Sequence, residues 1–339
     1  MIGLITGLVM LPVISCSRSS SYKDFTANLN RLESEGKYDS ADYYIGVNYD
    51  RFVDHEFELL KEKVYVNSQR GQYKKNLDVF RYGHERGYFF LLHPAIPAYE
   101  PYIGLEGFDE IVARDMELRR SANESSEPEY QVILPHRYNK KKAYPMVYIF
   151  HGGGSNNTRA ISEWTSDILD NNFIRVFIQS PVHADFDTFG WRNSDTLAVS
   201  FIEKLYSDLR MLYRIDTSSV FFGGVSAGGT VAVFSAFRSK IPVAGYIGVC
   251  TGIPLDLKID DYSARNNIRA LMISGENDYY KPRQDSLRQI YRSINLECRY
   301  MVLPGMGHQY PDNFSSLLDE NIPFIYAGKN FHQTGKTVR

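Results

Sequence analysis

Short runs of β-branched and aromatic residues alternate with helix-length segments through the second half of this chain, and this alternation limits the fold more than any other feature. The runs lie at 130–134, 146–150, 174–178, 220–222, 243–249, 268–274 and 298–303. The clearest helical segments between them are 195–212 and 227–237. Strands that alternate with helices are joined by right-handed crossovers. The pattern therefore predicts an α/β fold with a mostly parallel sheet covered on both faces.

A G-x-S-x-G motif at 224–228 lies between an expected strand and an expected helix. The string alone is a weak signal, so its position in a strand-to-helix turn decides the interpretation. Such a turn crowds the backbone on both sides of the central residue, which explains Gly224 and Gly228 and exposes the Ser226 hydroxyl at the carboxyl edge of the sheet. Ser226 is therefore the candidate nucleophile.

A serine nucleophile requires a base and a group that orients the base. The expected strand at 268–274 leads into Asp278, and the expected strand at 298–303 leads into His308. Carboxyl ends of parallel strands meet at one edge, so both side chains can converge on Ser226. We assign His308 as base and Asp278 as orienting acid, against the alternatives of a surface histidine and a helix cap. Other candidate acids are Glu276, Asp256 and Asp261.

The run His-Gly-Gly-Gly at 151–154 directly follows the expected strand at 146–150. Attack on a carbonyl develops negative charge, which backbone N–H donors can stabilise. We expect the N–H groups of Gly153 and Ala227, with Gly154 as a further candidate, to form this oxyanion hole. A phosphate-binding loop is disfavoured, because this glycine run does not lead into G-K-[ST] and the chain has no G-x-G-x-x-G that opens a helix.

Four aromatic residues are candidates for contact with a sugar or an aromatic acyl group: Trp191, Tyr279, Tyr280 and Tyr310. The alternative for each is ordinary packing on a long loop. The eight histidines show no close paired spacing, and the chain has no C-x-x-C. We therefore expect no metal and no cofactor.

These motifs together resemble those of the α/β-hydrolases of the esterase type, over residues 128–325. The segments at 129–135 and 144–147, the glycine run and the serine motif are similar to those of secreted carboxylesterases, feruloyl or acetyl esterases and polyhydroxyalkanoate-depolymerase-like enzymes. The resemblance implies hydrolysis of small or carbohydrate-linked esters through a serine ester, with His308 moving the proton and water as final acceptor. Prolyl-oligopeptidase-like serine peptidases share this constellation, and a non-catalytic binding scaffold is a third interpretation.

Residues 22–123 carry helical periodicity, ahead of a polar joint at 124–128 and a catalytic region at 128–330. A Gly-x-Tyr sequence recurs at 36–38 and 71–73, and this spacing of 35 residues is close to the tetratricopeptide period. We expect a small all-α, tetratricopeptide-like region. It either presents a surface to a protein partner or the substrate, or packs on the following domain as an appendage.

Residues 1–16 form an uncharged, apolar segment that ends at Cys16 and is too short to span a bilayer comfortably. Val13-Ile14-Ser15-Cys16 resembles a bacterial lipobox, although no Lys or Arg precedes the apolar run. The resemblance implies export and lipidation of Cys16, hence a periplasmic or outer-membrane lipoprotein of the cell envelope that contacts the membrane through its lipid anchor only. A plain N-terminal tail is the alternative.

The charge balance of the chain argues against nucleic-acid binding. The chain carries 38 basic and 40 acidic side chains, so it lacks the basic field that nucleic-acid binding requires.

Cys250 ends one expected strand and Cys298 begins another. Parallel strands would place them at opposite edges of the sheet, so we expect free thiols rather than a disulfide.

Overall fold

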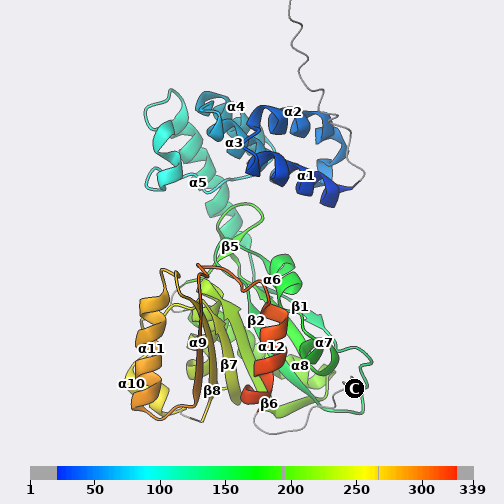
Figure 1. Cartoon of the computed structure of the whole chain (residues 1–339), viewed down its shortest axis with the longest axis vertical. Coiled ribbons are helices and arrows are strands. Elements are labelled where there is room, and N and C mark those ends of the chain that lie inside the picture. The colour runs from blue at the N-terminus through cyan, green and yellow to red at the C-terminus, as the bar shows by residue number, and fades with distance from the viewer. Residues whose placement is uncertain (1–20, 193–194, 266, 327–339) are drawn as a thin grey trace, which may run out of the picture. The chain divides into compact units, whose positions relative to one another are not determined.

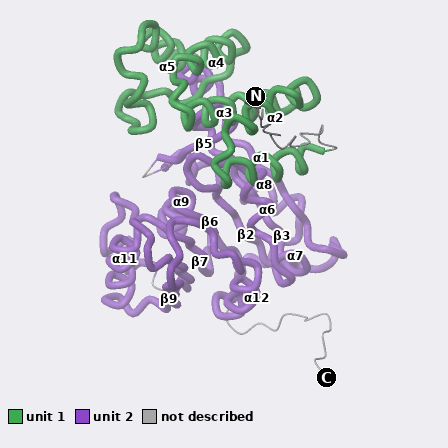
Figure 2. Tube along the Cα trace, turned by 45° about the horizontal axis from the view of Figure 1, so that its top comes forward, with its two compact units in different colours: residues 1–118 green, residues 119–339 purple. Residues whose placement is uncertain are grey.

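The computed structural model describes residues 21–192, 195–265 and 267–326. The expected leader at 1–16 with Cys16, and residues 327–330 of the expected catalytic region, lie outside these ranges. The chain divides into two compact units, Met1–Leu118 and Arg119–Arg339 (Figure 2). Within the described ranges, no helix combines the length and apolar character that crossing a membrane requires.

The first unit is helical (Figure 1). Its helices are α1 (Tyr22–Ser34), α2 (Tyr38–Asn48), α3 (Glu56–Gln69), α4 (Tyr73–Glu85) and the start of α5 (Phe108–Ser125), with short 3₁₀ turns η1 (Tyr49–Arg51), η2 (Val53–His55) and η3 (Pro97–Tyr102). The repeated Gly-x-Tyr sequence marks the α1–α2 and α3–α4 turns. Gly36 and Gly71 have φ angles of 68° and 69° there, in the left-handed region that glycine adopts without strain.

The buried carboxylate of Asp115 connects α5 to α4 and to the loop that follows α4. Asp115 on α5 is fully buried and accepts hydrogen bonds from the backbone N–H groups of Phe90 (2.6 Å) and Leu92 (2.9 Å). Its third partner is the His84 ring on α4, at 3.1 Å. Asp115 is also the last buried residue of α5. The division between the two units falls after Leu118, inside this helix and ahead of the polar joint at 124–128.

The second unit contains a seven-stranded sheet in the order β1-β3-β2-β6-β7-β8-β9. The strands are β1 (Glu129–Ile133), β2 (Tyr144–Phe150), β3 (Ile174–Gln179), β6 (Ile215–Val225), β7 (Val243–Val249), β8 (Arg269–Gly275) and β9 (Cys298–Leu303). Only β1 pairs antiparallel among these strands. A separate ribbon joins β4 (Val182–His183) and β5 (Phe189–Gly190). The seven runs expected as strands are the seven strands of the main sheet, so the prediction of a mostly parallel sheet is confirmed.

Helices cover both faces of this sheet (Figure 1). All seven residues of β2 are buried, and they alternate between two cores: Tyr148 and Phe150 belong to one, Val147 and Ile149 to the other. The first core includes residues of α8 (Thr196–Leu212), α9 (Ser226–Arg238), α10 (Ile259–Ser263) and α11 (Lys281–Ser293). The second includes residues of α6 (Asn157–Glu163), α7 (Asp167–Asn172) and α12 (Phe314–Ile325). Continuous apolar strands between two helical layers are the α/β arrangement that the sequence predicts.

Candidate active site

The turn from β6 into α9 holds Ser226 in an unusual backbone conformation. Ser226 has a φ angle of 54°, in the left-handed region. A Cβ added at Gly224 would lie 2.5 Å from the backbone of Gly228. A Cβ added at Gly228 would lie 2.1 Å from the carbonyl oxygen of His151. Both glycines are therefore required by close backbone approach, as the motif predicts.

Three side chains from the carboxyl ends of β6, β8 and β9 form a hydrogen-bonded chain. His308 Nε2 lies 2.7 Å from Ser226 Oγ, and His308 Nδ1 lies 2.7 Å from Asp278 Oδ1. The carboxylate can only accept a hydrogen bond, so Nδ1 donates to Asp278 and Nε2 is left to accept the Ser226 proton. Glu276 lies elsewhere, because its carboxylate accepts a hydrogen bond from the Gly305 N–H at 2.9 Å. The structure thus brings together the three residues that the sequence selects, in the geometry of a nucleophile, a base and an orienting acid.

The Asp278 carboxylate has further partners that sequence reasoning missed. Its Oδ1 accepts from the Tyr280 N–H at 2.8 Å, and its Oδ2 accepts from Gln284 Nε2 at 2.9 Å. Gln284 is fully buried on α11 and also donates to Ser274 Oγ at 3.0 Å. A polar residue on the buried face of a helix was the available signal, since Gln284 shares the i, i+3, i+7 face with Leu287 and Tyr291. Asp278 is 4% exposed and fixed at both oxygens.

The glycine run lies beside the serine turn. A Cβ added at Gly153 would lie 3.4 Å from the Ala227 Cβ, so the two expected oxyanion donors are neighbours. Gly154 differs from the expectation, because its N–H donates to the Phe189 carbonyl at 2.9 Å and is committed within the loop. Two N–H groups, those of Gly153 and Ala227, thus remain as the oxyanion-hole candidates.

The buried His151 ring braces this loop. One ring nitrogen, Nδ1, lies 2.7 Å from the Gly152 carbonyl, and the other, Nε2, accepts the Ser180 N–H at 3.2 Å. Burial lowers the pKa of His151 to about 4, so the ring is neutral at physiological pH and Nδ1 carries the donated proton. Both ring nitrogens of His151 are therefore engaged by neighbouring backbone groups, and the ring supports the loop.

The aromatic candidates occupy different environments, and the Tyr280 ring lies edge-on to His308 with centroids 5.0 Å apart. Trp191 is half-buried and donates its indole N–H to the His151 carbonyl at 2.8 Å, beside the glycine run. Tyr279 is 68% exposed, and its ring stacks on His308 with centroids 4.3 Å apart. The Tyr310 hydroxyl instead accepts the Trp164 indole N–H at 3.1 Å within the second core. Tyr279 is thus the exposed aromatic surface next to the candidate base.

Cys250 is a second residue that sequence reasoning did not connect with this site. It directly follows β7, is fully buried, and lies with Sγ 3.5 Å from the Gln309 carbonyl oxygen. Burial, reinforced by the neighbouring Asp278 carboxylate, raises the pKa of the Cys250 thiol to about 12. Cys298 begins β9, at the opposite edge of the sheet, and both thiols are free as expected.

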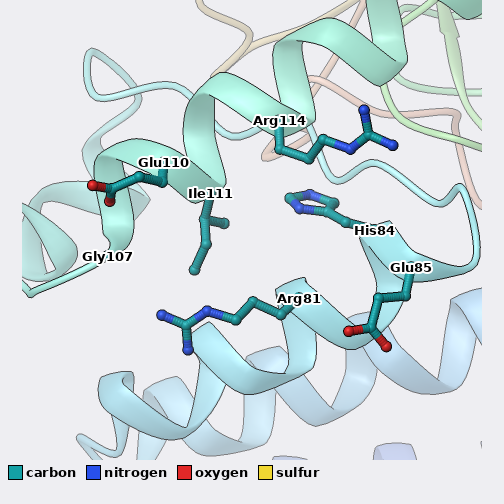
Figure 3. A pocket seen from close by; sticks show the side chains of 7 residues that line it. All are labelled: Arg81, His84, Glu85, Gly107, Glu110, Ile111 and Arg114. Atoms are coloured by element: carbon teal, nitrogen blue, oxygen red, sulfur yellow. The ribbon is translucent and has the colours of Figure 1, made fainter.

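A hollow of about 490 Å³ lies within the helical unit, between α4 and α5. Figure 3 shows the side chains of Arg81 and Arg114 on opposite sides of it, with the His84 ring between them. Each arginine pairs with an acid of its own helix, Asp78 for Arg81 and Glu117 for Arg114. None of the Ser226, Asp278 or His308 side chains lines this hollow, so it is separate from the hydrogen-bonded chain described above.

The fold and the position of Ser226 define an α/β-hydrolase. A family model described as phospholipase/carboxylesterase matches residues 137–323, more than half of the chain. The chain belongs to this phospholipase/carboxylesterase family. No curated protein matches it.

Several solved structures are similar to this chain. A ferulic acid esterase is 19% identical, covers 59% of this chain and 91% of its own, and has a TM-score of 0.50. An uncharacterized protein from Bacillus cereus ATCC 10987 is 21% identical over 90% of this chain and 98% of its own, with a TM-score of 0.49. A phospholipase/carboxylesterase from Dyadobacter fermentans DSM 18053 is 16% identical over 58% of this chain and 96% of its own, with a TM-score of 0.45. At these identities, the likeness to the ferulic acid esterase supports the fold.

Proposed function

We propose that this chain is a serine hydrolase that cleaves carboxylic esters, with Ser226, His308 and Asp278 as its catalytic triad. The observation that carries the proposal is the pair of 2.7 Å hydrogen bonds that His308 makes to Ser226 and to Asp278. Membership of a carboxylesterase family supports the same chemistry. No cofactor enters the proposed reaction.

The reaction begins when Ser226 Oγ attacks the ester carbonyl and its proton passes to His308 Nε2. Asp278 holds the Nδ1–H and stabilises the imidazolium that forms. The N–H groups of Gly153 and Ala227 stabilise the tetrahedral oxyanion. Collapse breaks the ester C–O bond, and His308 returns the proton to the leaving alcohol. Water then attacks the acyl-serine carbonyl and gives a proton to His308. His308 returns this proton to Ser226 Oγ as the bond between Oγ and the acyl carbon breaks, which releases the carboxylic acid.

We propose small or carbohydrate-linked esters, including those of aromatic acids, as the substrate class. The 68% exposed Tyr279 ring beside His308 supports this choice, because an aromatic face at the site can stack on a sugar or an aryl acyl group. The ferulic acid esterase among the similar structures is consistent with such substrates. Trp191 and Tyr310 are the other proposed contacts. Of the two, Trp191 is the better supported, because its ring lies against His151 at the start of the glycine run.

We further propose that the chain is exported and held in a bacterial cell envelope by lipid on Cys16, as the lipobox-like sequence suggests. The helical unit would then present a surface to a protein partner, and the hollow between α4 and α5 is a feature that such a partner could occupy. Membrane fractionation of cells that express the wild type or Cys16→Ala tests the anchor. We expect the wild type in the membrane fraction and the variant outside it; equal distribution contradicts the proposal.

The first test of the catalytic proposal is labelling with a fluorophosphonate, followed by peptide mass mapping and a series of p-nitrophenyl esters from acetate to decanoate. We expect the label on Ser226 and ester turnover that falls by about 10⁴-fold or more in Ser226→Ala and His308→Ala. Asp278→Asn should lose somewhat less than Ser226→Ala. Glu276→Gln is the matched control, and a larger loss there than at Asp278 would show that the acid is misassigned.

Peptide p-nitroanilides, methyl ferulate and an acetylated xylan complete the substrate panel. Faster turnover of the anilides than of the esters would move the assignment to a prolyl-oligopeptidase-like peptidase. A folded protein that takes no fluorophosphonate label would favour the binding scaffold instead.

A further inference from the structure

The ends of three neighbouring strands bring together a thiol, a carboxylate and an imidazole. Cys250 follows β7, Asp278 follows β8 and His308 follows β9. One potential ligand atom from each lies within 4.8 Å of the other two. We propose that Cys250, Asp278 and His308 form an inhibitory site for a soft divalent metal ion such as Zn²⁺. The binding site stands on this geometry, and its inhibitory effect rests on the proposed function.

The donor set matches the ligand preference of such an ion. Zinc binds Cys sulfur, His nitrogen and carboxylate oxygen at about 2.0 to 2.3 Å, so two ligands of one ion lie within roughly 4.5 Å of each other. The three ligand atoms already lie within 4.8 Å of one another, and the 2.7 Å contact between His308 Nδ1 and Asp278 Oδ1 lengthens when the ion enters between them. Three protein ligands and an open fourth position are a common zinc arrangement. Hard ions such as Mg²⁺ prefer oxygen ligands and do not suit this set.

The proposed ester hydrolysis gives Cys250 no role of its own. Its Sγ lies 3.8 Å from the Gly307 carbonyl oxygen and 3.5 Å from that of Gln309, on the loop that carries His308. A fully buried thiol is a poor nucleophile, so Cys250 is not a second catalytic residue. Metal ligation is the chemistry that its neighbours, one carboxylate and one imidazole, make available to it.

A metal ion bound at this site would prevent His308 from acting as a base, because it would change which ring nitrogen carries the proton. In the resting triad, Nδ1–H donates to Asp278 and Nε2 accepts the Ser226 proton. A metal ion on Nδ1 uses the lone pair there, so the ring proton must move to Nε2. The thiol gives its proton to water and binds as thiolate. Nε2 then donates to Ser226 instead of accepting from it, and the serine is no longer activated.

The test combines metal inhibition with a direct binding signal on the purified chain. Zn²⁺ and Cd²⁺ are titrated against ester hydrolysis, with Mg²⁺ as the hard-ion control, for the wild type, Cys250→Ser and Cys298→Ser. Each variant is compared with its own metal-free activity. In parallel, Cd²⁺ binding is followed by the ultraviolet thiolate-to-cadmium absorption band, which does not require the chain to be an esterase.

We expect one Zn²⁺ or Cd²⁺ per chain to inhibit the wild type and Cys298→Ser alike, and Mg²⁺ to have no effect. Cys250→Ser should need at least about tenfold more ion and lose the cadmium band, since removal of a ligand costs no less than removal of an outer-shell partner. Inhibition of Cys250→Ser at the wild-type concentration, or a band that disappears in Cys298→Ser instead, overturns the proposal.

Two further variants cover the cases in which the chain has no ester turnover or Cys250→Ser does not fold. Ser226→Ala keeps all three ligands and should retain the cadmium band unchanged, so a chain without ester turnover still reports on the metal site. Asp278→Asn keeps the thiol and the imidazole and covers the case in which Cys250→Ser fails to fold. It should bind Cd²⁺ at least about tenfold more weakly. Unchanged affinity there excludes the carboxylate as a ligand and overturns the three-residue site.

Discussion

Gly228→Ala is the sharpest test of how the serine turn is built. The added methyl carbon would lie 2.1 Å from the His151 carbonyl oxygen and 2.4 Å from that of Phe150. Real Cβ contacts essentially never fall below 3.0 Å, so atoms must separate by at least 0.9 Å. Both obstacles are backbone atoms at the end of β2, and neither can rotate away as a side chain would. The first turn of α9, which carries Ser226, must therefore shift.

The size of the effect follows from that displacement. A misplacement of about 1 Å in a catalytic group costs on the order of 10²-fold in rate. We therefore expect kcat/KM for a p-nitrophenyl ester to fall roughly a hundredfold in Gly228→Ala. Overpacking of a buried site should also lower the free energy of unfolding by about 1 to 3 kcal/mol, measured by chemical denaturation.

Gly307→Ala is the matched control. It makes the same chemical change next to His308, but a Cβ there meets nothing within 4 Å. We expect its activity to stay near the wild-type level. If Gly228→Ala is folded and turns over within about threefold of Gly307→Ala, the backbone contact does not position the serine and the reasoning fails.

Further predictions concern the helical unit and the second core. Burial and the neighbouring Glu62 carboxyl raise the pKa of Glu33 to about 7, so this group stabilises the fold fully below its ordinary pKa and progressively less as the pH rises through 7. Glu33→Gln should flatten this pH dependence of the unfolding free energy and raise the melting temperature at pH 8; a parallel shift of the wild-type curve would contradict it. Asp115→Asn replaces one of the two oxygens that accept the Phe90 and Leu92 N–H groups by an amide NH₂ and should cost about 1 to 3 kcal/mol in urea unfolding; a loss below about 0.5 kcal/mol would mean that these hydrogen bonds are dispensable. Trp164→Ala empties a fully buried position and should cost about 3 to 5 kcal/mol by the same measurement; an unchanged urea midpoint would refute this.

Most of the strands were predictable because they are nearly continuous apolar runs between turn residues, as in β2 and β3. The expected runs at 243–249 and 298–303 coincide with β7 and β9, whereas β6 begins at Ile215 rather than at Val220. The first part of β6 contains Asp216 and the polar residues after it, so it lacks the apolar signal of a buried strand. The two-stranded ribbon of β4 and β5 was not predicted, because each of its strands has only two residues and so shows no alternation of apolar and polar residues.

The candidate triad was predictable for a topological reason. Parallel strands deliver their loops to one edge, so Ser226, Asp278 and His308 could be paired without coordinates. What surrounds them could not be predicted in the same way. That the Gly154 N–H is taken by Phe189, and that Cys250 lies against Asp278, depends on loop conformations and on contacts between strands that no local pattern encodes.

The left-handed φ of Ser226 has a consequence for how this protein balances activity against stability. A non-glycine residue in that region costs roughly 1 to 2 kcal/mol, and a chain selected for stability alone would place glycine or asparagine there. The close backbone contacts of Gly224 and Gly228 hold the serine in place despite this cost. Ser226 thus keeps the hydroxyl that the proposed reaction needs at a position where glycine or asparagine would be more stable. The loss of stability in exchange for activity is confined to this one residue.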